Sequence, residues 1–140
     1  TIARYSQADF RIKGRNAMTE HYSVLGPEVT TDFKGREISR KDYELMDLLG
    51  SFDAVVVAGE AKSHCVAWTV EDLIDAAGTQ NELFKRIYLL EDCSSAVSVP
   101  GVVDYTEQAD AAYRRFAAMG MHVVRSTDPI ENWPGLDARK

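Results

Sequence analysis

Apolar residues gather in four short segments, at residues 10–13, 54–58, 87–90 and 122–125, and these lengths are typical of β-strands. The two middle segments are apolar at almost every position instead of alternating with polar residues. Continuous apolar character is typical of parallel strands, because both faces of a parallel sheet are covered. The pattern therefore predicts four strands, with the middle two buried in a parallel sheet.

Three helical patterns lie between these segments. The expected N-caps are Ser39, which forms a capping box with Asp42, and Ser63. A glycine follows each pattern, and glycine is common directly after a helix. The sequence therefore predicts helices over residues 40–49, from Ser63 to Gly78, and over residues 106–119.

The alternation of strands and helices predicts an α/β fold with an open, mainly parallel sheet, right-handed crossovers and helices on both faces. No internal repeat or linker divides the chain, so residues 1–140 are expected to form a single domain. Residues 14–38 are the longest irregular stretch and are long enough for a functional loop. The strand at residues 10–13 follows no other element, so it would lie at an edge or lack its neighbours.

Composition and charge narrow the function. Apolar residues make up 45% of the 140 residues and charged residues 27%, a mixture typical of a globular domain. A net charge of −6 argues against a nucleic-acid partner, and no apolar run is long enough to span a membrane. The N-terminal residues lack the apolar centre of a signal peptide. Two cysteines without metal-like spacing indicate reduced thiols, so we expect a cytoplasmic protein.

Cys65 lies at the junction of a predicted strand and a predicted helix. In open α/β sheets, ligands bind beyond the carboxyl ends of the strands, where this cysteine is expected. The unpaired N–H groups of a first helical turn favour a thiolate and could stabilise an oxyanion. Position alone leaves two alternatives open, a nucleophile and a small residue that packs the helix against the sheet.

The residues around Cys65 resemble a known family. The segment GEAKSHCVAWTVEDLIDAAG is similar to the nucleophile segment of the isochorismatase-like cysteine hydrolases, which include the nicotinamidases. Upstream, IKGRNAMTEHYSVL resembles the family segment in which Lys-Gly ends a strand and a Tyr-Ser pair follows. The resemblance implies a Rossmann-like, three-layer fold and hydrolysis of a non-peptide C–N bond in a small-molecule amide.

The resemblance also implies roles for individual residues. Cys65 would be the nucleophile that forms an acyl-enzyme, and Lys13 the catalytic lysine, whose cation favours the thiolate. A cis peptide bond is implied between Glu60 and Ala61, which would turn the Ala61 N–H toward the oxyanion together with that of Cys65. Glu60 departs from the small apolar residue that is usual in the family.

Three further residues are candidates for the substrate pocket. Tyr22 belongs to the Tyr-Ser pair, His64 adjoins the nucleophile, and His21 lies close to Lys13 in sequence. A packing or surface role is the alternative for both histidines. The three histidines of the chain do not have the spacing of metal ligands, so no metal site is expected within it.

The family's catalytic aspartate and its metal-binding residues lie N-terminal to the lysine, but only twelve residues precede Lys13. The resemblance therefore implies an N-terminally incomplete domain whose first strands are missing. A divalent metal such as zinc would be bound by the missing part, and an N-terminal fragment of the same protein could be a partner. The chain would then be a fragment, one piece of a nicked protein, or a short protein that keeps only a binding surface.

The leading hypothesis is an amidase-type cysteine hydrolase that forms a homo-oligomer and uses no cofactor from this chain. The alternative is a catalytically incomplete α/β binding or assembly domain, in which Cys65 has ordinary thiol reactivity. A redox role is disfavoured because no C-x-x-C motif is present. Outside the site, we expect Cys93 to pack in the core, Asp92 to tie loops together, and Trp133 to fold back onto the body.

Overall fold

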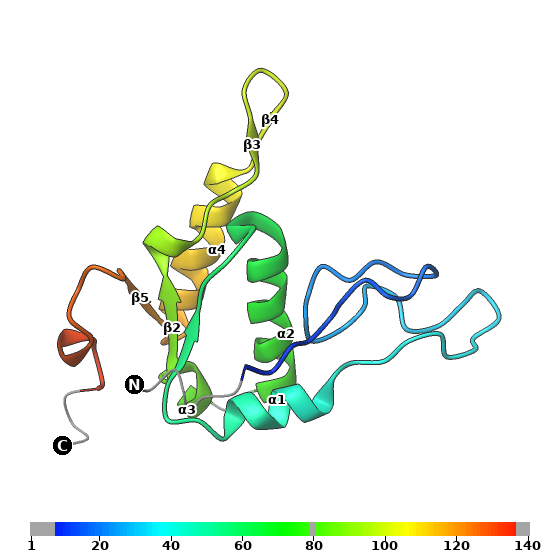
Figure 1. Cartoon of the computed structure of the whole chain (residues 1–140), viewed down its shortest axis with the longest axis horizontal. Coiled ribbons are helices and arrows are strands. Elements are labelled where there is room, and N and C mark those ends of the chain that lie inside the picture. The colour runs from blue at the N-terminus through cyan, green and yellow to red at the C-terminus, as the bar shows by residue number, and fades with distance from the viewer. Residues whose placement is uncertain (1–7, 79–80, 137–140) are drawn as a thin grey trace.

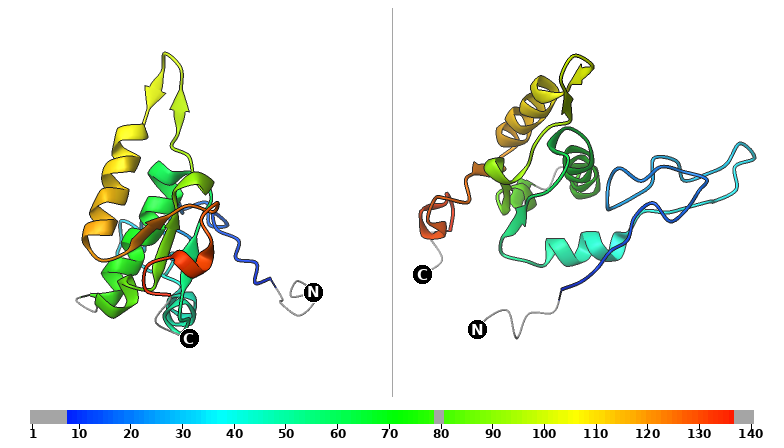
Figure 2. Two further views of the ribbon diagram at one scale, coloured as in Figure 1. Left: turned by 90° about the vertical axis from the view of Figure 1, so that its left-hand side faces the viewer. Right: turned by 45° about the horizontal axis from the view of Figure 1, so that its top comes forward.

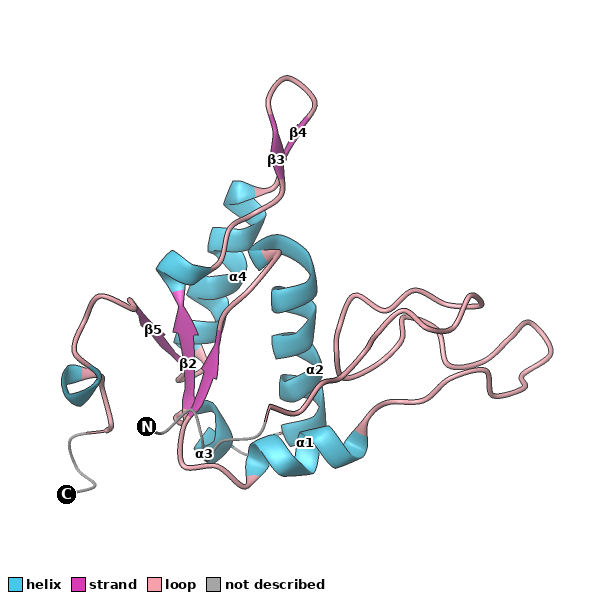
Figure 3. Cartoon of the chain, in the orientation of Figure 1, coloured by secondary structure: helices cyan, strands magenta, loops and turns pink. Residues whose placement is uncertain are grey.

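The computed structural model of the chain describes residues 8–78 and 81–136. A three-stranded parallel sheet forms its centre, in the order β1 (Val55–Val57), β2 (Ile87–Leu90) and β5 (His122–Val124). Figures 1 and 3 show these strands side by side, with β2 in the middle. Three of the four predicted strands and the α/β class with a parallel sheet are therefore confirmed.

The predicted strand at residues 10–13 is wrong. These residues form an irregular, extended segment, and Phe10 and Ile12 are exposed to solvent. Arg11 anchors the segment through an ion pair of 3.0 Å with Asp42. None of the described strands pairs with this segment. An alternating pattern needs such a partner before it forms a strand.

Two of the three predicted helices begin later than predicted, the third begins at Thr106 as predicted, and the helix at residues 81–84 was not predicted. Helix α1 (Tyr43–Gly50) is capped by Asp42, whose carboxylate accepts a hydrogen bond from the Leu45 amide at 2.9 Å. The predicted start at Ser39 is therefore wrong, because the aspartate caps the helix by itself. The other α-helices are α2 (Ala67–Ala77), α3 (Asn81–Phe84) and α4 (Thr106–Ala118).

One face of the sheet packs against all four α-helices. Paired residues of a parallel sheet share a face, so Val55 and Ile87 point to the same side, as do Val57 and Leu89. Val55, Ile87 and Leu89 are buried in one apolar core, and Val57 packs against it. The helices contribute the following buried side chains to this core: Met46, Val70, Leu73, Phe84, Tyr113 and Phe116.

The other face is covered by the C-terminal segment, and none of the α-helices in the described residues packs on it. This segment contains the short 3₁₀ helix η4 (Ile130–Asn132) and places Trp133 against Tyr88, with ring centroids 5.5 Å apart. The Tyr88 hydroxyl donates a hydrogen bond of 2.7 Å to the Pro134 carbonyl. The expectation that Trp133 folds back onto the body is confirmed. Helices were expected on both faces of the sheet, but on this second face the only helix among the described residues is the short η4.

Two segments extend away from this body, as Figures 1 and 2 show. One is the irregular loop of residues 14–38, and the other is a hairpin of β3 (Ser98–Val99) and β4 (Val103–Asp104) that the pattern did not predict. Within the described ranges, none of the helices has the length and apolar character needed to cross a membrane.

Candidate active site

Cys65 lies in the connection between β1 and α2. The chain leaves β1 through Gly59, passes a cis peptide bond between Glu60 and Ala61, and enters the π-helical turn η2 (Lys62–Val66), which continues into α2. The cis bond agrees with what the resemblance implies. Cys65 is a free, half-buried cysteine within η2, beyond the carboxyl end of a parallel strand.

The predicted cap at Ser63 is wrong. The N-cap of η2 is Ala61, whose carbonyl accepts a hydrogen bond of 3.1 Å from the Val66 amide, five residues later. The Ser63 hydroxyl instead accepts a hydrogen bond of 3.0 Å from the Val97 amide and lies 2.8 Å from Nδ1 of His64. The Ser63 side chain therefore binds the loop after β2 and accepts no hydrogen bond from the first amides of the helix.

A groove of about 330 Å³ runs beside β1 and contains Cys65 at its wall. Its lining includes the apolar side chains Val24, Leu49, Val55, Val57, Val66 and Leu73. Four predicted site residues, Lys13, Tyr22, Glu60 and Cys65, also line it. The fold therefore brings the predicted nucleophile and the predicted lysine to one groove, although they are far apart in the sequence.

The resemblance implied that Lys13 lies at the end of a strand. Lys13 instead reaches the groove from the irregular segment of residues 10–13. Its ammonium donates a hydrogen bond to the main-chain carbonyl of Tyr22. The side chain is exposed, so its charge is partly screened by solvent. Lys13 therefore adds a cation to the lining of the groove that contains Cys65.

Of the three candidates for the substrate pocket, Tyr22 lines the groove, and His64 contacts the Tyr22 ring with centroids 6.3 Å apart. Tyr22 also contacts Trp68 edge to face, with ring centroids 4.2 Å apart. His64 packs edge to face against Tyr105 at 4.8 Å and is not among the groove residues. His21 is also outside the groove lining, and its Nδ1 is buried without a hydrogen-bond partner.

Thr69 connects the irregular loop to the nucleophile segment. Its hydroxyl donates a hydrogen bond of 2.7 Å to the Cys65 carbonyl and accepts one of 3.1 Å from the Val24 amide. A threonine that bonds the carbonyl four residues earlier is common inside helices. The second bond, to residues 45 positions away, could not be predicted from local pattern.

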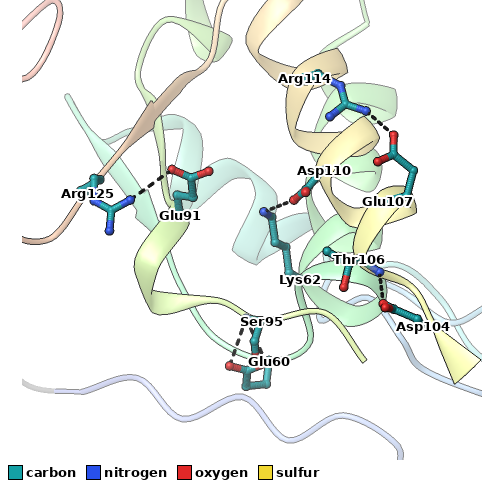
Figure 4. Close-up of polar contacts among 10 residues, drawn as sticks. All are labelled: Glu60, Lys62, Glu91, Ser95, Asp104, Thr106, Glu107, Asp110, Arg114 and Arg125. Carbon is teal, nitrogen blue, oxygen red and sulfur yellow. Dashed lines mark hydrogen bonds and ion pairs between the residues drawn. The ribbon is translucent and has the colours of Figure 1, made fainter. Parts of the chain in front are cut away.

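The loop after β2 holds the cis peptide segment. The Gly59 amide donates to the Cys93 carbonyl at 3.0 Å, and the Lys62 amide donates to the Ser95 carbonyl at 2.7 Å. The Glu60 carboxylate accepts bonds from the amide and the hydroxyl of Ser95, the latter at 2.8 Å, as Figure 4 shows. The unusual glutamate therefore has a structural partner outside the groove.

This second loop is itself fixed at the carboxyl end of the sheet. Asp92 accepts hydrogen bonds from the amide and the hydroxyl of Ser126, at 2.8 and 2.7 Å, and so ties the end of β2 to the end of β5. These bonds lower the pKa of Asp92 below its ordinary value. The expected tie through Asp92 is confirmed, whereas Cys93 is exposed and the expected core position is wrong.

The predicted nucleophile and lysine line the groove beside β1 and not the cavity over α2. Among the described residues, no group of three or more His, Cys, Asp or Glu side chains is placed to hold a metal ion. A larger cavity of about 460 Å³ lies over α2 beside Trp68 and Asp72, and its lining contains neither Cys65 nor Lys13. The candidate chemistry therefore belongs to the groove beside β1.

Comparisons with known proteins give one structural likeness. No protein-family model matches the chain, and no curated protein matches it. The solved structure described as "Acinetobacter baumanii nicotinamidase pyrazinamidease" is similar to this chain, with 20% identity, a TM-score of 0.48 and 79% of this chain covered. The chain spans 44% of the length of that protein. A likeness at this level says nothing about which bond a protein acts on.

Proposed function

We propose that the chain carries the nucleophile of an amidase-type cysteine hydrolase of the isochorismatase-like family, acting on a small-molecule amide. The observation that carries the proposal is the meeting of Cys65 and Lys13 in one groove. The resemblance to the family assigns the same two residues to the catalytic machinery. Lys13 supplies a cation to this groove, and the thiolate is the nucleophilic form of cysteine.

The proposed reaction has two steps. In the first, the Cys65 sulfur forms a bond to the amide carbonyl carbon, and the C–N bond breaks as the nitrogen takes up a proton and leaves as ammonia or an amine. In the second, water adds to the thioester, the C–S bond breaks, and the carboxylic acid is released with the thiol restored. The main-chain N–H groups of Ala61 and Cys65 are the proposed oxyanion donors.

The carboxylate that the resemblance implies as third catalytic group is proposed to come from polypeptide outside this chain. The chain would then act together with an N-terminal part, which would also hold any zinc. This arrangement predicts that thiol reactivity is measurable in the chain alone, while turnover of an amide depends on the added part.

The test measures thiol reactivity and hydrolysis separately. Alkylation of Cys65 and Cys93 by iodoacetamide is followed by peptide mass analysis, and we expect Cys65 to react faster although Cys93 is more exposed. Ammonia release from a panel of small amides is then measured for the complete protein and for its Cys65→Ser variant. Equal alkylation rates, or hydrolysis by Cys65→Ser at the wild-type rate, would contradict the proposal.

A binding or assembly domain is the second candidate, and one observation favours it. Val56 in the edge strand β1 is 46% exposed, and β1 is paired only with β2 in the described sheet. An exposed apolar strand edge can pair with another chain. This candidate predicts that Cys65 and Cys93 have the same pH dependence of alkylation.

A further inference from the structure

Lys62 is unusual because it is buried. Its exposed fraction is 7%, and it is the one lysine that is buried in the described part of the chain. Lysine is almost never fully buried unless it is paired, because removing an ammonium group from water is costly. The position of Lys62 at the start of η2, three residues before Cys65, therefore calls for a physical reason.

Two residues of α4 hold the Lys62 ammonium. Its Nζ lies 2.6 Å from Oδ1 of Asp110 and 4.5 Å from the ring centroid of Tyr113. These residues are three positions apart on α4 and so lie on one side of the helix. Burial raises the pKa of Tyr113, which leaves the phenol neutral at physiological pH and its ring available for a cation–π contact. Figure 4 shows the lysine reaching across to Asp110.

This pair differs from the other ion pairs of the same region. The side chains of Arg114 and Glu107, also on α4, are both exposed, as are those of Lys85 and Glu82. Exposed pairs contribute little because solvent screens them. In the Lys62–Asp110 pair the lysine side chain is 9% exposed and the aspartate side chain 42%, so solvent screens this pair less than the two exposed pairs. The pair joins the start of η2 to α4.

The geometry of η2 explains why this position matters for Cys65. The turn is π-helical, with the Val66 amide bonded to the Ala61 carbonyl, and it relaxes to an α-helical turn if the bonding shifts by one residue. Such a shift rotates the following side chains by about 100° around the helix axis. The Lys62 amide, bonded to the Ser95 carbonyl at 2.7 Å, and the Lys62 ammonium hold the start of η2 from two sides.

We propose that Lys62 is a positioning residue for Cys65: its ion pair with Asp110 holds η2 in the register that presents the thiol to the groove. This inference rests on the proposed function, because it assigns Lys62 to the presentation of the proposed nucleophile. It adds that α4, which contributes no residue to the groove lining, controls the reactivity of Cys65.

The experiment uses the full chain and compares alkylation of Cys65 with that of Cys93 in the same molecule. Lys62→Met keeps the length of the side chain and removes its charge, and we expect the Cys65 rate to fall about tenfold, since misplacement of a reacting group by about 1 Å is costly. The Cys93 rate stays unchanged. Lys85→Met, which removes a charge from an exposed pair, is the matched control and leaves both rates unchanged.

Asp110 supplies a second set of variants in case Lys62→Met does not fold. Asp110→Asn removes the negative charge that pairs with Lys62, and we expect a lower alkylation rate of Cys65. Asp110→Glu keeps a carboxylate, and we expect it to retain most of the wild-type alkylation rate. A role in stability alone would shift the unfolding midpoint of both variants without changing the ratio of the two alkylation rates.

The outcomes separate this inference from the proposed function. If wild-type Cys65 reacts faster than Cys93 and the folded Lys62 and Asp110 variants keep that ratio, the inference is overturned and the proposed function stands. If wild-type Cys65 reacts no faster than Cys93, the proposed function fails and the inference fails with it. A lower ratio in Lys62→Met and Asp110→Asn, with restoration in Asp110→Glu, supports both.

Discussion

The hydroxyl of Thr69 donates a hydrogen bond of 2.7 Å to the main-chain carbonyl of Cys65. The same oxygen accepts a bond from the Val24 amide, so one side chain joins the nucleophile segment to the loop that carries Tyr22. The groove is built from both of these parts, with Val24 and Tyr22 on one side and Cys65 on the other. Thr69 therefore decides how firmly the two walls of the groove are held together.

Replacement of Thr69 by valine keeps the shape of the side chain and removes both bonds. We expect the free energy of unfolding to fall by about 1 kcal/mol, which is typical for loss of a partly buried hydrogen bond. We also expect faster proteolysis within residues 14–38. Urea unfolding and limited proteolysis measure these effects, with Thr31→Val, an exposed threonine of the same loop, as control. An unchanged cleavage rate in Thr69→Val would show that other contacts hold the loop.

Lys13 is expected to act through its charge. In Lys13→Ala, we expect the alkylation rate of Cys65 at pH 7 to fall about tenfold, because the substitution removes the cation from the groove that contains Cys65. Lys13→Arg retains most of the rate, and added salt lowers the wild-type rate because Lys13 is exposed. Lys34→Ala, which changes an exposed lysine of the irregular loop of residues 14–38, serves as control. The role of Lys13 is excluded if Lys13→Ala and Lys34→Ala react alike.

The parts of the fold that the sequence predicted depend on short-range patterns. The continuous apolar run at residues 87–90 predicts the buried central strand β2, because a strand covered on both faces needs apolar side chains on both. Gly78 ends α2 with a positive φ of 59°, which glycine adopts without strain. Both signals lie within a few residues, and both are confirmed.

Most of the parts that the sequence did not predict depend on bonds between distant residues, and the hairpin of β3 and β4 is the exception. The four-residue alternation at residues 10–13 is as compatible with an extended loop as with a strand, and only a partner strand decides between them. The hairpin of β3 and β4 had a local signal, since Pro100 and Gly101 between valines are typical of a turn. The roles of Lys62 and Ser95 had none, because their partners come from α4 and from the cis peptide loop.

The bond between Asp92 and Ser126 predicts a pH dependence of stability. Because hydrogen bonds from Ser126 lower the folded-state pKa of Asp92 below its unfolded value, the ionised carboxylate stabilises the fold. This contribution is fully present above the unfolded pKa, near about 3.9, and is lost as the pH falls through the lower folded pKa. Asp92→Asn should therefore be less stable than wild type at pH 7, with a smaller difference at pH 3.

Urea unfolding at the two pH values measures this difference, with Asp47→Asn, an exposed aspartate of α1, as control. The free energy of unfolding of Asp92→Asn is compared with that of wild type at each pH. If the difference is the same at pH 3 and pH 7, the charge of the Asp92 carboxylate does not contribute to the bond with Ser126. Because Ser126 follows β5 and Asp92 follows β2, the measurement also reports how firmly the carboxyl ends of the two strands are joined.

The open edge of β1 predicts self-association. The strand consists of three valines without a charged residue, and Val56 is 46% exposed. Charged residues on an edge strand oppose pairing between chains, and their absence favours it. We expect the chain to associate as its concentration rises and Val56→Lys to remain monomeric, with an unchanged unfolding midpoint because the side chain points partly to solvent. Sedimentation velocity over a range of concentrations measures this.

Val102→Lys distinguishes the strand edge from exposed apolar surface in general. Val102 lies in the turn of the hairpin between β3 and β4 and is 80% exposed, so it offers more apolar area than Val56 but belongs to no strand. If pairing along β1 drives association, Val102→Lys associates like wild type. If both variants are monomeric, exposed apolar side chains act without strand pairing, and β1 has no special role in assembly.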